Sequence, residues 1–150
     1  MDEVLQPRPS GLLRRFGAMI YDLLLIIALL FLSTLPFIAL RGGESVEPQN
    51  FNYQITMVLV VYLFFVGFWT SKGRTLGMQS WGLQLQTPDG RLPSVRAASL
   101  RFIASILSLA CAGLGFLWQL VDRDKLTWHD RISNTRLMYY PKKNKNKDKK

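Results

Sequence analysis

The apolar segment at residues 16–40 constrains the fold of this chain most strongly, because it holds a single charged residue, Asp22, in 25 positions. A helix that crosses a bilayer needs about 20 predominantly apolar residues, so this segment is long enough to span. A second segment, residues 53–70, has no charge in 18 positions and ends in aromatic residues of the kind found at membrane interfaces. We therefore expect an all-α membrane protein with two transmembrane helices.

A third apolar segment, residues 99–121, is less regular than the first two. It is 23 residues long, carries Arg101 near its start and is interrupted by Gly113 and Gly115. Irregular backbone at membrane depth is tolerated where protein or water satisfies its polar groups. The segment is therefore either a full crossing or a re-entrant segment that enters and leaves on the same side.

Two other classes of protein can be weighed against a membrane protein. Arg14 and Arg15 precede an apolar run, as in a secretory signal, but the run is far longer than the ~7 to 15 residues usual there, and no Ala-x-Ala cleavage pattern follows. A soluble helical bundle needs amphipathic elements around its core, and three apolar segments in 150 residues leave too few of them. A membrane protein is the better interpretation.

The distribution of positive charge predicts the orientation. Residues 1–15 contain three Arg and residues 71–98 contain four basic residues, whereas residues 41–52 contain one Arg against two Glu. The positive-inside rule therefore predicts a multi-pass protein of the cell (inner or plasma) membrane, with residues 1–15 and the second connection in the cytoplasm.

The C-terminal tail conflicts with a full third crossing. Of the net charge of +9, residues 142–150 supply +5 from six Lys and one Asp. Three crossings would place this tail outside, against the same rule. We therefore favour a re-entrant third segment that bends near Ala112, Gly113 and Gly115, with a full crossing as the alternative. The tail, residues 141–150, is expected to be disordered and to touch anionic lipid headgroups.

The connection between the second and third segments has the pattern of a small structured cap. Trp81, Leu83 and Leu85 alternate with Gly or Gln, which is the period of a half-buried strand, and a Pro-Asp-Gly turn follows at residues 88–90. We expect a short cytoplasmic β-hairpin over residues 80–96, which a strand at residues 135–140 could join.

The isolated Asp22 is the strongest candidate site residue. A charged side chain at the centre of a bilayer costs roughly 2.5–3.5 kcal/mol on insertion scales, so it is rarely left without a partner or a role. Arg15 lies two helical turns earlier, about 10.5 Å along the axis, on nearly the same face. Arg15 can reach the headgroups on its long stem, but the short side chain of Asp22 cannot, so we expect the protein interior to receive it.

The order of several motifs resembles the RDD family of small membrane proteins. The motifs are Arg15, Ala18 and Asp22; Thr75-Leu76-Gly77; Asp89-Gly90; Leu100-Arg101; and Trp128-His129-Asp130-Arg131 with Asn134-Thr135. The resemblance covers residues 12–140, so the expected membrane domain is residues 16–140 after an N-terminal segment 1–15. The family is named for one arginine and two aspartates, which the resemblance puts at Arg15, Asp22 and Asp130. Met78 departs from the lysine usual after Thr-Leu-Gly.

The resemblance implies a loose association with transport and no established catalytic chemistry. From the residues, a charge network of Arg15, Asp22, Arg101, His129 and Asp130 could bind a cation or proton, with Asp130 bringing a second carboxylate to the mouth of the same cavity. Alternatively, the same charges pair as Arg15 with Asp22 and Arg101 with Asp130, and lock the fold of a non-transporting adaptor or assembly factor. Two or three helices cannot enclose a pathway alone, so transport implies a homo-oligomer or a partner membrane protein.

Other functions find little support in the residues. One Cys and one His, Cys111 and His129, make neither an ordinary zinc site nor a disulfide framework, and no nucleophile motif is present. We expect no enzyme activity, no metal and no cofactor. The Lys-rich tail has no aromatic residues on which bases could stack, so we expect no nucleic-acid partner. The lipid bilayer itself is the expected partner.

Overall fold

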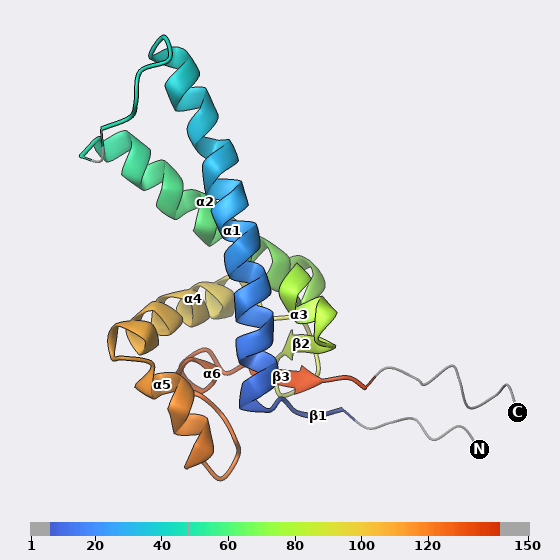
Figure 1. Ribbon diagram of the computed structural model, residues 1–150. Coiled ribbons are helices and arrows are strands. Elements are labelled where there is room, and N and C mark those ends of the chain that lie inside the picture. The colour runs from blue at the N-terminus through green and yellow to red at the C-terminus, as the bar shows by residue number, and fades with distance from the viewer. Residues whose placement is uncertain (1–6, 48, 142–150) are drawn as a thin grey trace, which may run out of the picture.

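The computed structural model describes residues 7–47 and 49–141 of the chain, and two long helices dominate it. Helix α1 (Leu12–Leu40) runs through most of the height of the molecule in Figure 1, and α2 (Phe51–Lys72) returns from the loop at its upper end. By length and composition both can cross a membrane, and a third span is available if a bent helix pair is counted as one. The two predicted transmembrane helices are confirmed.

The polarity of α1 is the reverse of that of a helix in a soluble protein. Large apolar side chains such as Leu24 and Phe31 point outward, with 64% and 67% of their surface exposed. The buried residues of α1 are Arg15, Ala18 and Asp22. Apolar surface on the outside and charge on the inside suit a lipid environment, where the surroundings are as apolar as a protein core. Arg15 and Asp22 share one buried face, as their spacing predicts.

Helix α2 has a polar cap at its start and a glycine after its last turn. The Asn50 side chain accepts a hydrogen bond from the Tyr53 backbone N–H at 3.1 Å, which caps the first turn. Gly73 follows the last turn with φ of 66°, the left-handed conformation that favours glycine. A Cβ there would also lie 2.8 Å from the Leu85 carbonyl oxygen, so the next strand packs directly on this helix end.

The third apolar segment is a broken helix. Helix α4 (Val95–Ala110) is capped by Ser94, and it is followed by α5 (Leu114–Leu117) and the 3-10 turn η1 (Trp118–Leu120) at an angle of 107°. Ala112 and Gly113 lie at the break with φ of 54° and 77°. The predicted bend at Ala112 and Gly113 is therefore present, whereas Gly115 lies inside α5.

Three short strands join distant parts of the chain into one sheet. The strands are β1 (Arg8–Pro9), β2 (Leu83–Gln86) and β3 (Arg136–Tyr139), in the order β1-β3-β2 with antiparallel pairing throughout. The predicted small β unit exists, with its first arm at β2. Its pairing arm is β3 rather than residues 91–96, because a turn at residues 87–91 leads directly to the α4 cap.

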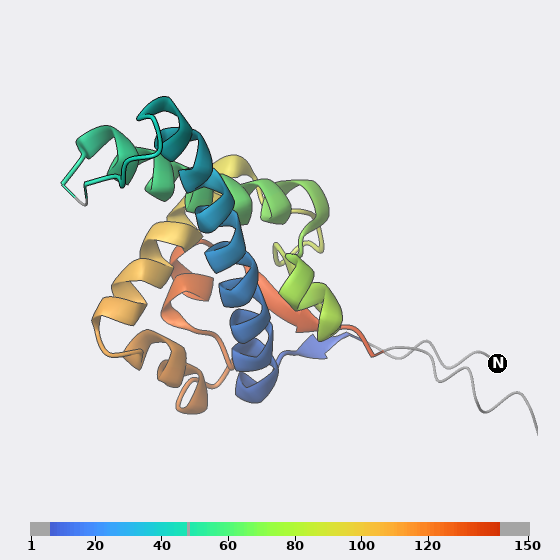
Figure 2. The ribbon, with the colours of Figure 1, turned by 45° about the horizontal axis from the view of Figure 1, so that its top comes forward.

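Two short helices complete the structure on opposite sides of α1. Helix α3 (Leu76–Ser80) lies with β2 on one side, and α4, α5 and α6 (Trp128–Ile132) lie on the other in both views (Figures 1 and 2). The apolar core lies where the sheet meets α1, α2 and α4. Its buried members are Ala18, Val66, Trp69, Met78, Leu83, Leu85, Ala98 and Leu137.

Candidate functional site

One buried carboxylate, Asp130, connects three separate segments of the chain. Its Oδ2 accepts a hydrogen bond from Arg15 Nη1 at 2.7 Å, and its Oδ1 accepts one from Arg101 Nη1 at 2.6 Å. Each of the three side chains is at most 3% exposed. Helices α1, α4 and α6 are thus joined by two buried ion pairs on one acid.

Helix α6 presents Asp130 through a capping box. The Thr127 hydroxyl accepts a hydrogen bond from the Asp130 backbone N–H at 3.3 Å, and Asp130 Oδ2 accepts one from the Thr127 backbone N–H at 3.1 Å. The carboxylate is therefore held at the start of its own helix in addition to its contacts with the two arginines. This five-residue helix orients the acid of the cluster.

Hydroxyl groups satisfy much of the remaining polarity of the two arginines. Arg15 Nε donates to Ser10 Oγ at 2.9 Å, and Arg101 Nη1 donates to Thr135 Oγ1 at 2.9 Å. Thr135 in turn lies 2.6 Å from Ser133 Oγ. Within the described part of the chain, Arg15 Nη2 is buried without a hydrogen-bond partner. The cluster has two guanidinium groups and one carboxylate, so its net charge is +1.

The environment of Asp130 keeps it ionised. Burial opposes ionisation, but the Arg101 and Arg15 guanidinium groups outweigh it, so the pKa of Asp130 lies well below its ordinary value. Removing one partner of such a buried pair is costly because a buried charge is left uncompensated. The geometry therefore makes Asp130 a permanent counter-ion for two arginines.

Asp22 lies outside this cluster. Its Oδ2 accepts a hydrogen bond from the Thr75 hydroxyl at 2.5 Å, and its Oδ1 accepts one from the Gly77 backbone N–H at 2.9 Å. The carboxylate thus docks α1 on the start of α3. The suggested pairing of Arg15 with Asp22 is wrong: among the described residues, Arg15 forms its ion pair with Asp130. The suggested pairing of Arg101 with Asp130 is correct.

His129 is buried beside the cluster as a neutral ring. It is 2% exposed, its Nδ1 has no partner within the described residues, and its ring lies 4.6 Å from that of Phe116, centre to centre. Burial, with a further contribution from the Arg101 guanidinium, lowers the pKa of His129 from 6.5 to about 3. The proximity of Asp130 opposes this and is outweighed.

This shifted pKa predicts acid sensitivity of the fold. Below pH 6.5 the unfolded chain binds a proton at His129 that the folded chain does not bind until about pH 3, so stability is complete above pH 6.5 and falls through that window. At pH 5 the loss is about 2 kcal/mol. Thermal unfolding in detergent from pH 7.5 to 4.5 measures it. His129→Gln should show a shallower pH slope, and identical slopes for the two proteins would contradict the prediction.

An apolar crevice runs from the charge cluster along the membrane helices. Its volume is about 700 Å³, and it is lined by residues of α1, α2 and α4 together with Met78, Phe116, His129 and Leu137. Arg15, Asp22 and Arg101 are its charged lining residues. Asp130 is not among its lining residues, although the two arginines that pair with Asp130 are. The expected second carboxylate at the mouth of this cavity is therefore wrong.

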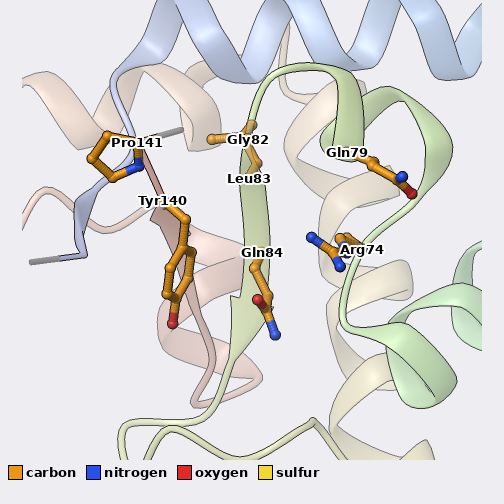
Figure 3. A pocket seen from close by; sticks show the side chains of 7 residues that line it. All are labelled: Arg74, Gln79, Gly82, Leu83, Gln84, Tyr140 and Pro141. Carbon is orange, nitrogen blue, oxygen red and sulfur yellow. The ribbon is translucent and has the colours of Figure 1, made fainter. Parts of the chain in front are cut away.

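A second pocket of about 350 Å³ lies beside β2 and is shown in Figure 3. Its lining residues are Arg74, Gln79, Gly82, Leu83, Gln84, Tyr140 and Pro141. None of the five predicted site residues belongs to this set. Its one charged lining residue is Arg74.

The structure brings together four of the five predicted site residues. Arg15, Arg101 and Asp130 form the cluster, His129 is buried beside it, and Asp22 is held separately by α3. The partners that were not predicted as site residues are mainly hydroxyls, above all Thr75, Thr127 and Thr135. Thr127 could have been found, since Thr-x-x-Asp is a capping pattern. Among the described residues, no group of three His, Cys, Asp or Glu could hold a metal ion.

One of the comparisons with known proteins found a match. A family model described as the RDD family matches residues 9–134, a range that includes Arg15, Asp22, Arg101 and Asp130. No curated protein and no solved structure matches the chain. Because the family match covers most of the chain and two of its helices are long and apolar enough to cross a membrane, this protein belongs to the RDD family of membrane proteins.

Proposed function

We propose that this protein takes part in transport in the membrane and that Asp22 is the group that binds and releases a proton there. The observation that carries the proposal is the difference between the two buried acids. Asp130 is held between two guanidinium groups, whereas the described partners of Asp22 are a neutral hydroxyl and a backbone N–H. Asp22 can therefore change its charge without leaving an arginine unpaired.

The contacts of Asp22 favour a proton over a metal cation. A cation such as Ca²⁺ takes six to eight oxygen ligands, whereas both described partners of Asp22 offer it N–H or O–H donors. A proton needs only one oxygen of the carboxylate. Asp22 also lines the crevice, whereas Asp130 does not. This supports proton binding as the form of ion handling at the site.

The sheet supports a re-entrant third segment. Strand β3 pairs with β1, which precedes α1, and with β2, which follows α2. If α1 and α2 both cross the bilayer, β1 and β2 lie on the same side, and β3 must lie there too. The broken helix of α4 and α5 then enters and leaves on that side. By the positive-inside rule this side is the cytoplasm, which gives a multi-pass protein of the cell membrane with a cytoplasmic N-terminus.

The transport proposal requires more than one chain. Two spanning helices and one broken helix do not enclose a pathway, and α1 and α2 expose much apolar surface along their length. We therefore propose a homo-oligomer or a complex with another membrane protein. We also propose that the Lys-rich tail contacts anionic lipid headgroups. Its residues 142–150 lie outside the described part of the chain.

The test is proton movement in proteoliposomes with Asp22→Asn. The amide keeps an oxygen for Thr75 or Gly77 but cannot exchange a proton, so we expect loss of proton flux with insertion intact. Glu44→Gln, in the loop between the two long helices, is the matched control and should leave flux unchanged. Wild-type flux in Asp22→Asn reconstituted at equal density contradicts the proposal.

A second candidate is a non-transporting adaptor or assembly factor in which the charges only lock the fold. The two ion pairs of Asp130 favour it, because they join three helices without exposing a charge. On this alternative, wild-type proteoliposomes carry no proton flux above protein-free liposomes. Asp22→Asn then weakens only the docking of α1 on α3, which appears as reduced thermal stability.

A further inference from the structure

The apolar crevice ends at a site with unbalanced positive charge. Its walls are formed by aliphatic and aromatic residues of α1, α2 and α4, such as Ile26, Val61 and Phe102. Arg15 and Arg101 line it near one end of α1, and Arg15 is the fourth residue of that helix. In a helix that crosses a bilayer, this position is close to the level of the lipid headgroups.

The charges at this end do not cancel. Arg15 and Arg101 share a single carboxylate, Asp130, and His129 is neutral, so one positive charge is left over. Arg15 Nη2 is a buried donor with no partner among the described residues. A buried donor without a partner is unfavourable, and more so when it is charged. An anionic oxygen that reached it would satisfy both the charge and the hydrogen bond.

We propose that this crevice binds a bilayer lipid with an anionic headgroup, whose acidic oxygens pair with Arg15 and Arg101 while an acyl chain occupies the apolar walls. The volume of about 700 Å³ lies within the ~300–1,000 Å³ range of ligand sites. Guanidinium groups suit phosphate oxygens because their N–H groups form a planar fork. A free phosphate ion gains nothing from the apolar walls, so the lining selects a lipid.

The lipid headgroup and the proton are proposed to bind different charged groups, although Arg15, Arg101 and Asp22 line the same crevice. Both oxygens of that carboxylate accept hydrogen bonds from α3 and its preceding residue, and it lies two turns deeper in α1 than Arg15. Asp22→Asn should therefore retain lipid binding even when it has lost proton flux. Failure of one proposal can thus be distinguished from failure of the other.

Two isoleucines of α4 provide a matched pair for the experiment. Ile106 lines the crevice and is 52% exposed, whereas Ile103 is 55% exposed and is not part of the lining. Ile106→Trp fills the crevice and Ile103→Trp adds the same bulk elsewhere on the helix. Ser105→Phe, also in the lining, is a second filling variant if the first is unstable.

The measurement is lipid binding by native mass spectrometry and thermal stability in a neutral detergent. The probes are dioleoyl phosphatidic acid, dioleoyl phosphatidylcholine and inorganic phosphate. We expect phosphatidic acid to bind wild type and Ile103→Trp at least about tenfold more tightly than it binds Ile106→Trp, a difference of about 1.4 kcal/mol. Equal binding of the two lipids, equal binding by the two Trp variants, or displacement of the lipid by inorganic phosphate overturns the proposal.

Discussion

Asp130→Asn is expected to lower the free energy of unfolding by about 3–5 kcal/mol, because it leaves two buried guanidinium groups without a counter-ion. Arg15 and Arg101 are each 3% exposed, so bulk water cannot replace the lost carboxylate. The amide oxygen of the substituted side chain can still accept a hydrogen bond from the Thr127 backbone N–H. The change in unfolding free energy therefore reports the lost charge rather than a lost helix cap. Equilibrium unfolding in detergent micelles measures the change.

The control for this substitution is Asp89→Asn. Asp89 forms an ion pair with Arg91 at 3.7 Å, but their side chains are 71% and 83% exposed. Exposed pairs contribute roughly 0–1 kcal/mol because water screens them and side-chain entropy opposes them. Equal effects of the two substitutions would mean that the Asp130 cluster does not hold the helices together.

Gly77→Ala should destabilise the protein by roughly 1–3 kcal/mol, the usual range for overpacking. A Cβ on Gly77 would collide with the Ala18 carbonyl oxygen and lie 2.7 Å from Asp22 Oδ1. The first of these atoms is backbone in the middle of α1 and cannot move aside. Helix α3 would have to shift, and the hydrogen bond from Gly77 to Asp22 would weaken with it. Thermal unfolding in detergent detects the change.

Gly67→Ala provides a comparison with the opposite expected sign. Gly67 lies inside α2, and a Cβ there meets nothing within 4 Å. Alanine in a helix interior is favoured over glycine by roughly 0.5–1 kcal/mol, so this variant should be as stable as wild type or slightly more stable. Destabilisation of both variants to the same extent would show that the close approach of α3 to α1 is not responsible.

The membrane character of this protein could be predicted from local properties alone. The length and composition of residues 16–40 and 53–70 determine two spanning helices because a bilayer sets the number of apolar residues required. The bend at Ala112 and Gly113 also has a local cause, since Gly adopts positive φ readily. Alternation at residues 81–86 likewise predicted strand β2.

Partner choice among the charges could not be predicted in the same way. Arg15 and Asp22 are two turns apart on one helix face, yet Arg15 contacts Asp130, 115 positions later in the sequence, and Asp22 contacts the start of α3. Strand β2 pairs with β3 across about 50 residues rather than with the segment after its turn. Each of these choices depends on how segments far apart in the sequence pack against one another.

By itself, the sequence determined that this chain enters a membrane, that one acid lies among apolar residues, and which residues carry charge. Only the tertiary structure decided that Asp130 neutralises two arginines, that Asp22 has neutral partners, and that a crevice ends at Arg15. The physical reason is that insertion into lipid depends on the summed transfer free energy of contiguous residues. Ion pairing and cavity shape depend on distances between residues far apart in the sequence, which packing alone sets.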